Sequence, residues 1–468
     1  MNMGRKTTYL TDFILGLFIL LFITLVVRKV GSLGEAGSVG ARHWIVYVVF
    51  PLLGATALLL SFATKQRIRI WLACGLIGFM AIGYALDLSL LIIKWRAGTQ
   101  LPKDKQRLLA AAKKAGQIID TRTPLELLDD LRNKGQQIVP LVTPGTILRM
   151  RNQPLVADAK VMPLAGLSSV RTILCNESGQ YIFFESDEHG FNNPRGIHSA
   201  AGPFDIAVIG DSFAMGVCVP PEKTIAAYLR AFYPKTINLG YADAGPLLYL
   251  ATLKEYGLPL KPKVVVMFYY SGNDFEASYR ELSYPILAHY LMPTFSQGLR
   301  HKQSIVNSFL TEIEHAEEQR ARANRVEANK PWLTSGSEWR RLASLSHLRE
   351  SVGLDHRGDS LAPEVFLRSL KQVLVEMKRT VESWRGSLIF VYLPHYGELE
   401  DYNLNRGERN SILGLANEVG IKAIDAHALF SQQTNPFKIF PYGLPSHYNE
   451  MGYSVLSEAI REQVVSSR

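Results

Sequence analysis

Phe204-Asp205-Ile206-Ala207-Val208-Ile209-Gly210-Asp211-Ser212 is the stretch that decides the fold of this 468-residue chain. It is typical of a short apolar strand that ends at a glycine, with a serine soon after. The run 264–270 is rich in β-branched and aromatic residues and lacks the alternation of a half-exposed strand, so both its faces are expected to be covered. Further strands are predicted at 236–240, 388–393 and 421–424, and helical spacing occupies 224–232, 246–256, 363–384, 403–419 and 450–465.

Strands that alternate with helices predict an α/β fold with a parallel sheet covered by helices on both faces. Such sheets bind their ligands at the carboxyl ends of the strands, so the residues that follow each strand are the place to look for chemistry. A serine, a glycine, an asparagine and a histidine are expected at that rim. They lie in Gly210-Asp211-Ser212 after the first strand, at Gly240 after the second, in Ser271-Gly272-Asn273-Asp274 after the third and in Ser446-His447-Tyr448-Asn449 before the last helix.

These residue types fit acyl transfer. The hydroxyl of Ser212 is a weak nucleophile and needs an adjacent base, and histidine is the usual base because its pKa lies near neutrality. His447 is the candidate for that role. A tetrahedral oxyanion also needs aimed hydrogen-bond donors. The candidate donors are the backbone N–H of Gly240, the side-chain amide of Asn273 and the backbone N–H of Ser212.

Each block also has a plainer interpretation. Gly-Asp-Ser is a common turn sequence, Asn273 beside Asp274 can form an Asx-turn, and His447 can be a buried or helix-start histidine. Asn449 fits the N-cap of the last helix better than a catalytic role. The order of the blocks and their placement at the strand ends favour the catalytic interpretation.

The same blocks resemble those of the GDSL/SGNH hydrolases over residues 200–468. The resemblance implies a flavodoxin-like three-layer α/β/α sandwich, with Ser212 as nucleophile, His447 as base, and Gly240 and Asn273 in the oxyanion hole. A further stretch, Ser186-Asp187-Glu188-His189-Gly190-Phe191-Asn192-Asn193, resembles a lead-in of some bacterial members and extends the expected domain to 161–468. Known relatives act on esters of lipids, aryl compounds and acylated sugars, and some transfer acyl groups, so the resemblance does not choose a substrate.

One position departs from the family pattern. Where the family commonly has an Asp two or three residues before the catalytic histidine, this chain has Leu444 and Pro445. Three alternatives follow: a Ser–His dyad whose imidazole is held by a backbone carbonyl, another acid such as Asp425 at the end of the fifth strand, or a weakened or inactive site. We favour the dyad, because the other groups have little reason to be assembled otherwise and loss of a triad acid lowers turnover by about 10⁴ without abolishing it.

Residues 1–98 predict a membrane anchor with three transmembrane helices, at about 9–28, 44–64 and 70–93. Each run is apolar over nearly the length of about 20 residues that a helix needs to cross a bilayer. Asp87 interrupts the last run. It is interpreted either as a functional intramembrane acid or as a side chain that snorkels to the interface.

Two further regions flank the predicted sheet. Residues 99–160 are expected to form a connecting helical and irregular region, with a helix start at Thr123-Pro124-Leu125-Glu126. Residues 276–360 form an insertion that follows Asn273 closely. A lid or acceptor-binding element over the site and a packing or oligomer contact are both open for this insertion.

Composition excludes several classes of protein. Hydrophobic residues make up 47% and charged residues 20%, which excludes disordered and collagen-like chains. Three cysteines exclude a disulfide-rich fold, and Cys175 and Cys218 are either a pair or buried free thiols. Much of the net charge of +9 flanks the apolar runs and indicates membrane edges rather than nucleic-acid binding. No zinc-type spacing and no dinucleotide fingerprint is present in the sequence, so no metal and no cofactor is expected.

Together these patterns predict a membrane-anchored serine hydrolase that cleaves carboxylic esters, with O-acyl groups on envelope glycans as the suggested substrate. The expected location is a bacterial inner membrane, spanned several times, with the catalytic part outside the cytoplasm, although basic residues are nearly balanced on the two sides. One alternative is an O-acyltransferase that works with envelope polysaccharide machinery. Another is a non-catalytic carbohydrate-binding or scaffold protein on a hydrolase fold.

Overall fold

The computed structural model describes residues 2–33, 45–98, 103–157, 159–328, 336–352 and 362–466. The chain divides into two compact units. The first unit comprises Met1–Pro102 and Val326–Asp359, and the second unit comprises Lys103–Arg325 and Ser360–Arg468. The insertion is therefore shared between the two units.

A five-stranded parallel sheet forms the centre of the second unit, in the order β5-β4-β6-β7-β8. The order reverses between β4 and β6, as in flavodoxin-like sheets, and such a switch point is where ligands bind. All five predicted strands are confirmed. Their bounds are β4 (Ile206–Ile209), β5 (Thr236–Asn238), β6 (Val264–Tyr270), β7 (Ser387–Leu393) and β8 (Lys422–Asp425).

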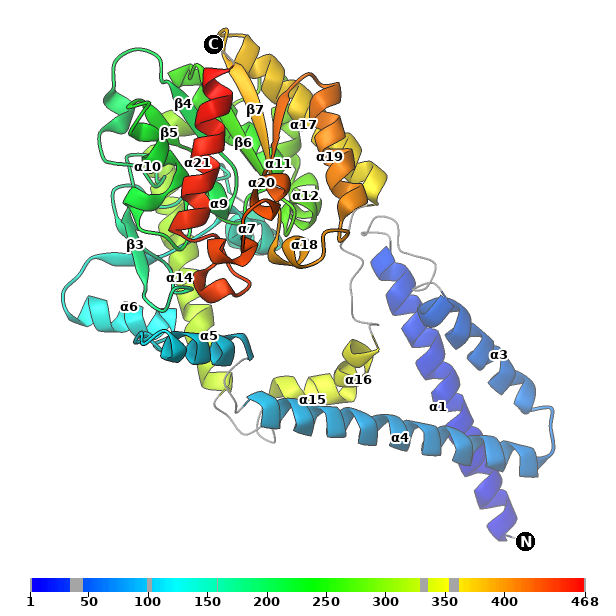
Figure 1. Cartoon of the computed structure of the whole chain (residues 1–468). Coiled ribbons are helices and arrows are strands. Elements are labelled where there is room, and N and C mark those ends of the chain that lie inside the picture. Colours follow the sequence, from blue (N-terminus) through cyan, green and yellow to red (C-terminus); the bar gives the residue numbers. More distant parts are fainter. Residues whose placement is uncertain are drawn as a thin grey trace. The chain divides into compact units, whose positions relative to one another are not determined.

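Helices cover both faces of this sheet, which confirms the predicted three-layer α/β/α architecture (Figure 1). Because neighbouring residues of a strand point to opposite faces, Ala207 and Ile209 lie in one apolar core and Ile206 and Val208 in the other. The first core includes α11 (Pro246–Thr252), α17 (Pro363–Glu382) and α19 (Arg406–Glu418), and the second includes α10 (Ile225–Arg230), α20 (Ala426–Ser431) and α21 (Glu450–Val465).

A second, three-stranded sheet was not predicted. It joins β1 (Ile138–Pro140), β2 (Arg171–Cys175) and β3 (Ile182–Glu185), with β1 parallel to β2 and β3 antiparallel to it. The helix α6 (Pro124–Asn133) packs on this sheet, and its predicted capping box between Thr123 and Glu126 is confirmed. Since β1 pairs with β2, the predicted boundary at residue 161 does not separate two domains. The second unit also contains α5 (Lys103–Lys114), α7 (Pro144–Arg149), α8 (Pro154–Ala157), α12 (Asp274–Leu282), α13 (Pro285–Ala288) and most of α14 (Gln303–Ala328).

Lys254 is a buried cation that ties the insertion to the core of the second unit. Its ammonium group donates hydrogen bonds to the backbone oxygens of Tyr290 and Met292, at 2.7 and 2.8 Å, and lies 2.5 Å from a carboxylate oxygen of Glu376. Replacing Lys254 by Met is expected to lower the free energy of unfolding by about 3 kcal/mol, because the acceptors of a buried charge are left without their partner. Urea unfolding of the full chain in detergent, followed by tryptophan fluorescence, measures this loss.

Lys263→Met is the matched control for this substitution. Lys263 also pairs with a carboxylate, that of Asp205 at 2.8 Å, but its side chain is 58% exposed. Exposed pairs contribute less than about 1 kcal/mol, so the control is expected to unfold close to the wild type. Equal losses for Lys254→Met and Lys263→Met would contradict the anchoring role of Lys254.

Among its described residues, the first unit contains two helices that are long and apolar enough to cross a membrane, within Thr7–Thr24 and Gln66–Lys94. The predicted middle span forms instead a π-helix, Ile45–Val49, followed by the 12-residue α3 (Phe50–Ser61), which rises only about 18 Å against a hydrocarbon core of about 30 Å. The prediction of three transmembrane helices is therefore not confirmed. Trp44, at the start of that predicted span, lies outside the described residues. The two long helices are α1 (Asn2–Leu33) and α4 (Gln66–Gly98).

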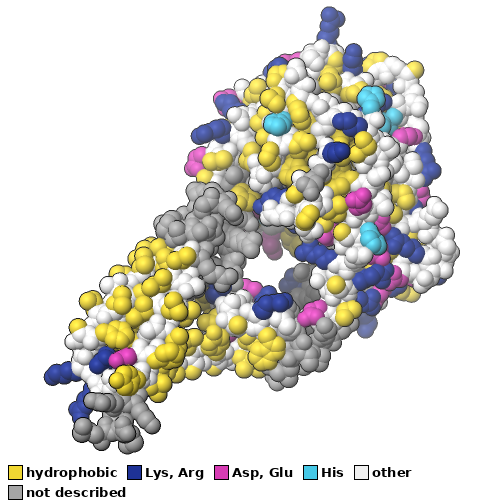
Figure 2. All heavy atoms as spheres, turned by 180° about the vertical axis from the view of Figure 1, so that it is seen from behind, with side chains coloured by type: hydrophobic (Ala, Val, Ile, Leu, Met, Phe, Trp, Pro, Cys, Tyr) yellow, Lys and Arg dark blue, Asp and Glu magenta, His cyan; other side chains and the backbone are white. Residues whose placement is uncertain are grey.

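Large apolar side chains are exposed along these helices, and Figure 2 shows the hydrophobic surface that they form on the first unit. Phe13, Trp71 and Phe79 are 63%, 79% and 77% exposed. A soluble monomer rarely leaves so continuous an apolar surface in water, so this surface fits contact with lipid.

Asp87 has a partner that the sequence did not indicate. Its carboxylate is fully buried and accepts a hydrogen bond from the backbone N–H of Leu348 at 2.6 Å. Leu348 lies in α16 (Ser346–Ser351), which follows α15 (Gly336–Ala343) in the insertion and packs on α4. Asp87 thus ties α16 to α4 within the first unit, and the snorkelling interpretation was wrong. The part of the insertion that contains α16 therefore makes a packing contact, which is one of the two alternatives that the sequence left open.

Candidate active site

Ser212 stands at the carboxyl end of β4, where it begins the short helix α9 (Ser212–Met215). Asp211 caps this helix by accepting a hydrogen bond from the N–H of Phe213 at 2.9 Å. Since Ser212 is the first helical residue, its own backbone N–H has no acceptor within the helix. Gly210 lets strand and helix meet closely, because a Cβ there would lie 2.9 Å from the Cβ atoms of both Ala214 and Phe268.

His447 reaches Ser212 from the loop before α21. Its Nε2 atom lies 2.8 Å from the Oγ atom of Ser212, and its ring packs against the ring of Phe213 with centroids 4.9 Å apart. Asn449 caps α21 by accepting hydrogen bonds from Met451 and the next residue, as predicted. The cap holds the end of the loop that carries His447.

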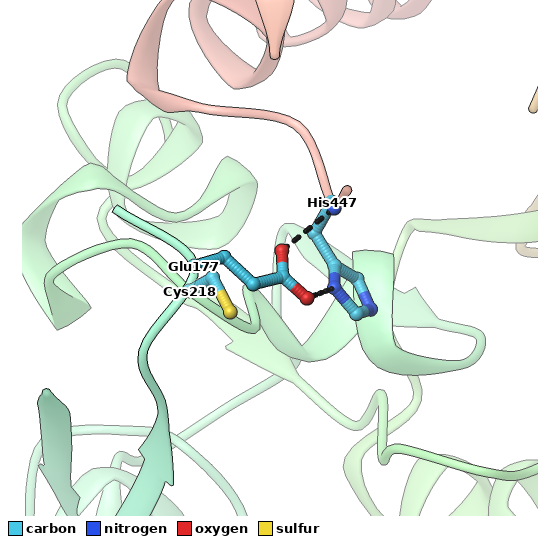
Figure 3. Close-up of side chains that lie close together, drawn as sticks. All are labelled: Glu177, Cys218 and His447. Atoms are coloured by element: carbon cyan, nitrogen blue, oxygen red, sulfur yellow. Dashed lines mark hydrogen bonds and ion pairs between the residues drawn. The ribbon is translucent and has the colours of Figure 1, made fainter. Parts of the chain in front are cut away.

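Glu177 is the acid that the sequence analysis missed. One carboxylate oxygen lies 2.8 Å from Nδ1 of His447, and the other accepts the backbone N–H of His447 at 2.8 Å (Figure 3). The predicted dyad, in which a backbone carbonyl holds the imidazole, was therefore wrong, because a carboxylate holds the imidazole. Asp425 is not that carboxylate: it caps α20 by accepting hydrogen bonds from the backbone N–H groups of His427 and Ala428.

A signal for Glu177 was present in the two cysteines. Cys175 and Cys218 form a disulfide, the pairing that the sequence analysis had left open. Cys175 precedes Glu177 by two positions, and Cys218 follows Ser212 by six. The disulfide therefore places Glu177 only eight chain positions and one covalent bond from Ser212, far closer than the sequence separation suggests.

The charges of the site support a base at His447. Burial lowers the pKa of His447, but the hydrogen bond and charge of Glu177, helped by the charge of Asp211, outweigh burial and leave the pKa raised. Burial raises the pKa of Glu177, and its bonds to His447 outweigh burial and leave that pKa lowered. Burial raises the pKa of Asp211 to about 6. Glu177 is thus ionised near neutral pH and can stabilise the imidazolium that forms when His447 takes a proton.

The structure changes the expected set of oxyanion donors. The N–H of Gly240 already donates to the side-chain oxygen of Asn238 at 2.9 Å, so the expectation of a free donor there was wrong. Asn273 precedes α12 without capping it, and its Oδ1 atom is buried with no partner among the described residues. Ser212 and Asn273 follow the neighbouring strands β4 and β6, and the backbone N–H of Ser212 and the side-chain amide of Asn273 remain the candidate donors.

Gly240 instead permits a close contact with α9, the helix that begins at Ser212. A Cβ at this position would lie 2.5 Å from the Cβ of Ala214 and 2.6 Å from the backbone nitrogen of Met215. Gly240→Ala is therefore expected to displace α9 and to lower kcat/KM for ester hydrolysis by about 10², the effect of a misplacement of about 1 Å. The control is Gly414→Ala in α19, where nothing lies within 4 Å of the new Cβ. Ester hydrolysis by Gly240→Ala at the wild-type rate would contradict this role.

Among the described residues, two groups of side chains bring together residue types that can bind a metal ion. In the first, one atom each from Glu177, Cys218 and His447 lie within 4.8 Å of one another. The sulfur of Cys218 is in the disulfide and the other two atoms bond to each other, so this group is not suited to hold a metal. In the second, the carboxylate of Asp187 already binds His198 at 2.9 Å and accepts two backbone N–H groups.

Comparison with known proteins finds similarity at the level of structure. No protein-family model and no curated protein matches this chain. A G-D-S-L-family lipolytic protein from Desulfitobacterium hafniense is 14% identical with a TM-score of 0.31, over 56% of this chain and 99% of its own. An alpha/beta hydrolase from the metagenome of Lake Arreo, Spain, is 14% identical with a TM-score of 0.32, over 57% of this chain and 96% of its own. A catalytic mutant of an acetylxylan esterase from Geobacillus stearothermophilus is 13% identical with a TM-score of 0.30, over 57% of this chain and 95% of its own. The solved structures that resemble this chain thus include a lipolytic protein of the GDSL family and an acetylxylan esterase.

Proposed function

We propose that the second unit is a serine esterase. The observation that carries this proposal is the pair of 2.8 Å contacts that run from Glu177 through His447 to Ser212. An acid that orients a histidine, beside a serine at a helix start, is the arrangement that activates a hydroxyl for attack on an ester.

The proposed reaction has two halves. The Oγ atom of Ser212 attacks the ester carbonyl while Nε2 of His447 takes its proton, and the N–H groups of Ser212 and Asn273 stabilise the oxyanion. His447 then gives the proton to the departing alcohol, which leaves an acyl-enzyme. Water, deprotonated by His447, attacks this acyl group, and the acid departs as Ser212 regains its proton.

The non-catalytic alternative loses its main support. It rested on the absence of an acid before His447 in the sequence, and Glu177 supplies a carboxylate from another part of the chain. A binding protein has no need of a carboxylate that raises the pKa of a histidine beside a serine hydroxyl.

Hydrolysis of p-nitrophenyl acetate by the purified full chain in detergent tests the esterase proposal. The wild type is expected to release nitrophenol with saturable kinetics, and His447→Ala is expected to lower kcat by at least about 10³ because the base is removed. A wild-type rate no higher than that of His447→Ala would overturn the proposal.

We further propose that α1 and α4 anchor the protein in a membrane, with the second unit outside the cytoplasm. The exposed apolar surface of these helices supports the anchor, and the Cys175–Cys218 disulfide supports an oxidising compartment. Two crossings put the N-terminus and the second unit on the same side of the bilayer, whereas three crossings would put them on opposite sides.

Labelling of single cysteines in intact cells with an impermeant maleimide tests this topology. In a Cys74→Ser background, a cysteine at the exposed position Glu382 is expected to be labelled, and an N-terminal tag cysteine is expected to be labelled as well. Labelling of Glu382→Cys alone would support three crossings. Protection of Glu382→Cys until the cells are lysed would place the second unit in the cytoplasm.

An O-acylated envelope glycan is the substrate class that we propose for this anchored esterase. An enzyme fixed at the outer face of a membrane meets its substrate at that surface, where acylated glycans present ester bonds. Incubation with an acetylated glycan and a labelled acyl donor separates the outcomes. Free labelled acid supports hydrolysis, whereas label on the glycan supports acyl transfer instead.

A further inference from the structure

The Cys175–Cys218 disulfide joins two segments of the proposed site. One is the loop 176–181, called the acid loop because it carries Glu177, and the other is the segment 212–219, which begins at Ser212. Cys175 ends β2, two residues before Glu177, and Cys218 lies six residues after Ser212 in a buried position. The bond connects positions 43 residues apart, whose Cα atoms lie 5.5 Å apart. It therefore shortens the path between Glu177 and Ser212 from more than thirty residues of chain to eight.

The disulfide also lies close to Glu177 and His447. The sulfur of Cys218 lies within 4.8 Å of a carboxylate oxygen of Glu177 and of a ring nitrogen of His447, and Figure 3 shows the three side chains together. The pairing of β2 with β3 shifts register between Ile173 and Cys175, so the ladder of the small sheet is irregular where the acid loop begins. The loop thus starts at Cys175, which both ends β2 and carries the covalent link.

The acid loop also bonds to the loop that carries His447, through Glu177 and through Tyr442, whose hydroxyl donates to the backbone oxygen of Ser178 at 2.8 Å. Its remaining hydrogen bonds run to a third segment. The amide of Asn176 donates to the backbone oxygen of Asp120 at 2.6 Å, and the N–H of Asp120 donates to the oxygen of Gly179 at 2.8 Å. Among the described residues, no hydrogen bond links 176–181 to 212–219. The disulfide is the direct link between these two segments.

We propose that the Cys175–Cys218 disulfide is a positioning element that holds Glu177 against His447, so that the esterase is fully active only in its oxidised form. This inference rests on the proposed esterase function. It adds a redox regulation of the same site, because reduction of the disulfide lowers the activity of the enzyme.

The change between the oxidised and the reduced enzyme is a thiol–disulfide exchange. A dithiol reductant gives two electrons and two protons to the bond, which becomes two thiols, while the dithiol becomes a disulfide. The freed loop no longer fixes the carboxylate of Glu177, and His447 loses part of its orientation. A misplacement of about 1 Å costs about 10² in rate, so the reduced enzyme is expected to retain about 1–10% of its kcat.

A double-mutant cycle tests positioning against general stabilisation. The pair Cys175→Ala and Cys218→Ala is made in the wild type and in Glu177→Gln, and kcat for p-nitrophenyl acetate is measured at pH 8. We expect the pair to lower kcat about 10- to 100-fold in the wild type and less than about 3-fold in Glu177→Gln, because the disulfide then has no carboxylate to position. Equal losses in both backgrounds would overturn the inference.

The pH dependence gives a second readout. The ionisable groups that act on His447 are Glu177 and Asp211, and only Glu177 lies on the tethered loop. The alanine pair is expected to move the acid limb of kcat/KM to lower pH, as loss of the Glu177 contact does. An unmoved acid limb together with a lower kcat would indicate a purely structural bond and overturn the inference.

Reduction of the folded wild type tests the same claim without a substitution. In a Cys74→Ser background, dithiothreitol is expected to lower kcat about 10- to 100-fold, and reoxidation is expected to restore it. The variant with both Cys175→Ala and Cys218→Ala has no disulfide, so dithiothreitol is expected to leave its kcat unchanged. An oxidised wild type without activity would refute the esterase proposal, whereas an active wild type that ignores dithiothreitol would refute the positioning role alone.

Discussion

Ser212→Ala is expected to abolish ester hydrolysis, with kcat/KM at least about 10⁴ lower than in the wild type. Removal of the nucleophile of a serine hydrolase leaves only the oxyanion donors and substrate binding, which account for a residual 10³–10⁴ over water. The hydroxyl of Ser212 lies 2.8 Å from Nε2 of His447, and alanine has no atom to replace it. Steady-state hydrolysis of p-nitrophenyl acetate by both proteins measures the effect.

The control for this variant is Ser278→Ala. Its hydroxyl donates to the backbone oxygen of Asp274, within α12, and takes no part in the proposed reaction. Ser278→Ala is expected to stay within about 3-fold of the wild type. If Ser212→Ala kept more than about a tenth of the wild-type activity, another group would have to be the nucleophile.

Glu177→Gln is expected to lower kcat about 10²- to 10⁴-fold, because a neutral amide cannot stabilise the imidazolium and can favour the wrong tautomer. The comparison is made at pH 8, on the alkaline side of the ordinary histidine pKa. Asp425→Asn is the matched control, since Asp425 was the acid that topology suggested and the structure shows it capping α20. It is expected to stay within about 3-fold. Larger loss from Asp425→Asn than from Glu177→Gln would contradict the assignment.

The same variant has a signature in the pH profile. His447 acts as a base only when neutral, so activity falls as the pH drops through its pKa. Glu177 raises this pKa above the ordinary value of 6.5, and burial alone would lower it. The acid limb of kcat/KM is therefore expected above pH 6.5 in the wild type and at lower pH in Glu177→Gln. A limb that moves to higher pH in the variant would contradict this electrostatic account.

Local signals predicted the sheet and the proximity of Ser212 to His447. The strand 264–270 lacks alternation because both its faces are buried, and the helix after Thr123 carries its own capping box. Ser212 was predictable because the residue pattern after a parallel strand fixes its place at the rim, as confirmed by its position after β4. The proximity of His447 to Ser212 followed from the same topology.

The parts that were missed depend on tertiary contacts. Glu177 stands in a loop between two short strands, and its place at the site depends on tertiary contacts: its hydrogen bonds to His447 and the disulfide that joins Cys175 to Cys218. The engagement of Gly240 by the side chain of Asn238 is a contact within one turn that residue types do not reveal. Hydropathy measures the length of an apolar run but not the length of the helix formed, so the run that contains α3 looked long enough to span.

Labelling with a fluorophosphonate probe tests the central claim most directly, since such probes react only with an activated serine. Wild-type protein treated with the probe is expected to gain one adduct in its intact mass, and peptide mapping is expected to place it on Ser212. Ser212→Ala should gain none, and His447→Ala should react far more slowly. An unlabelled wild type, or an adduct that persists in Ser212→Ala, would contradict the claim that Glu177, His447 and Ser212 form a working hydrolase site.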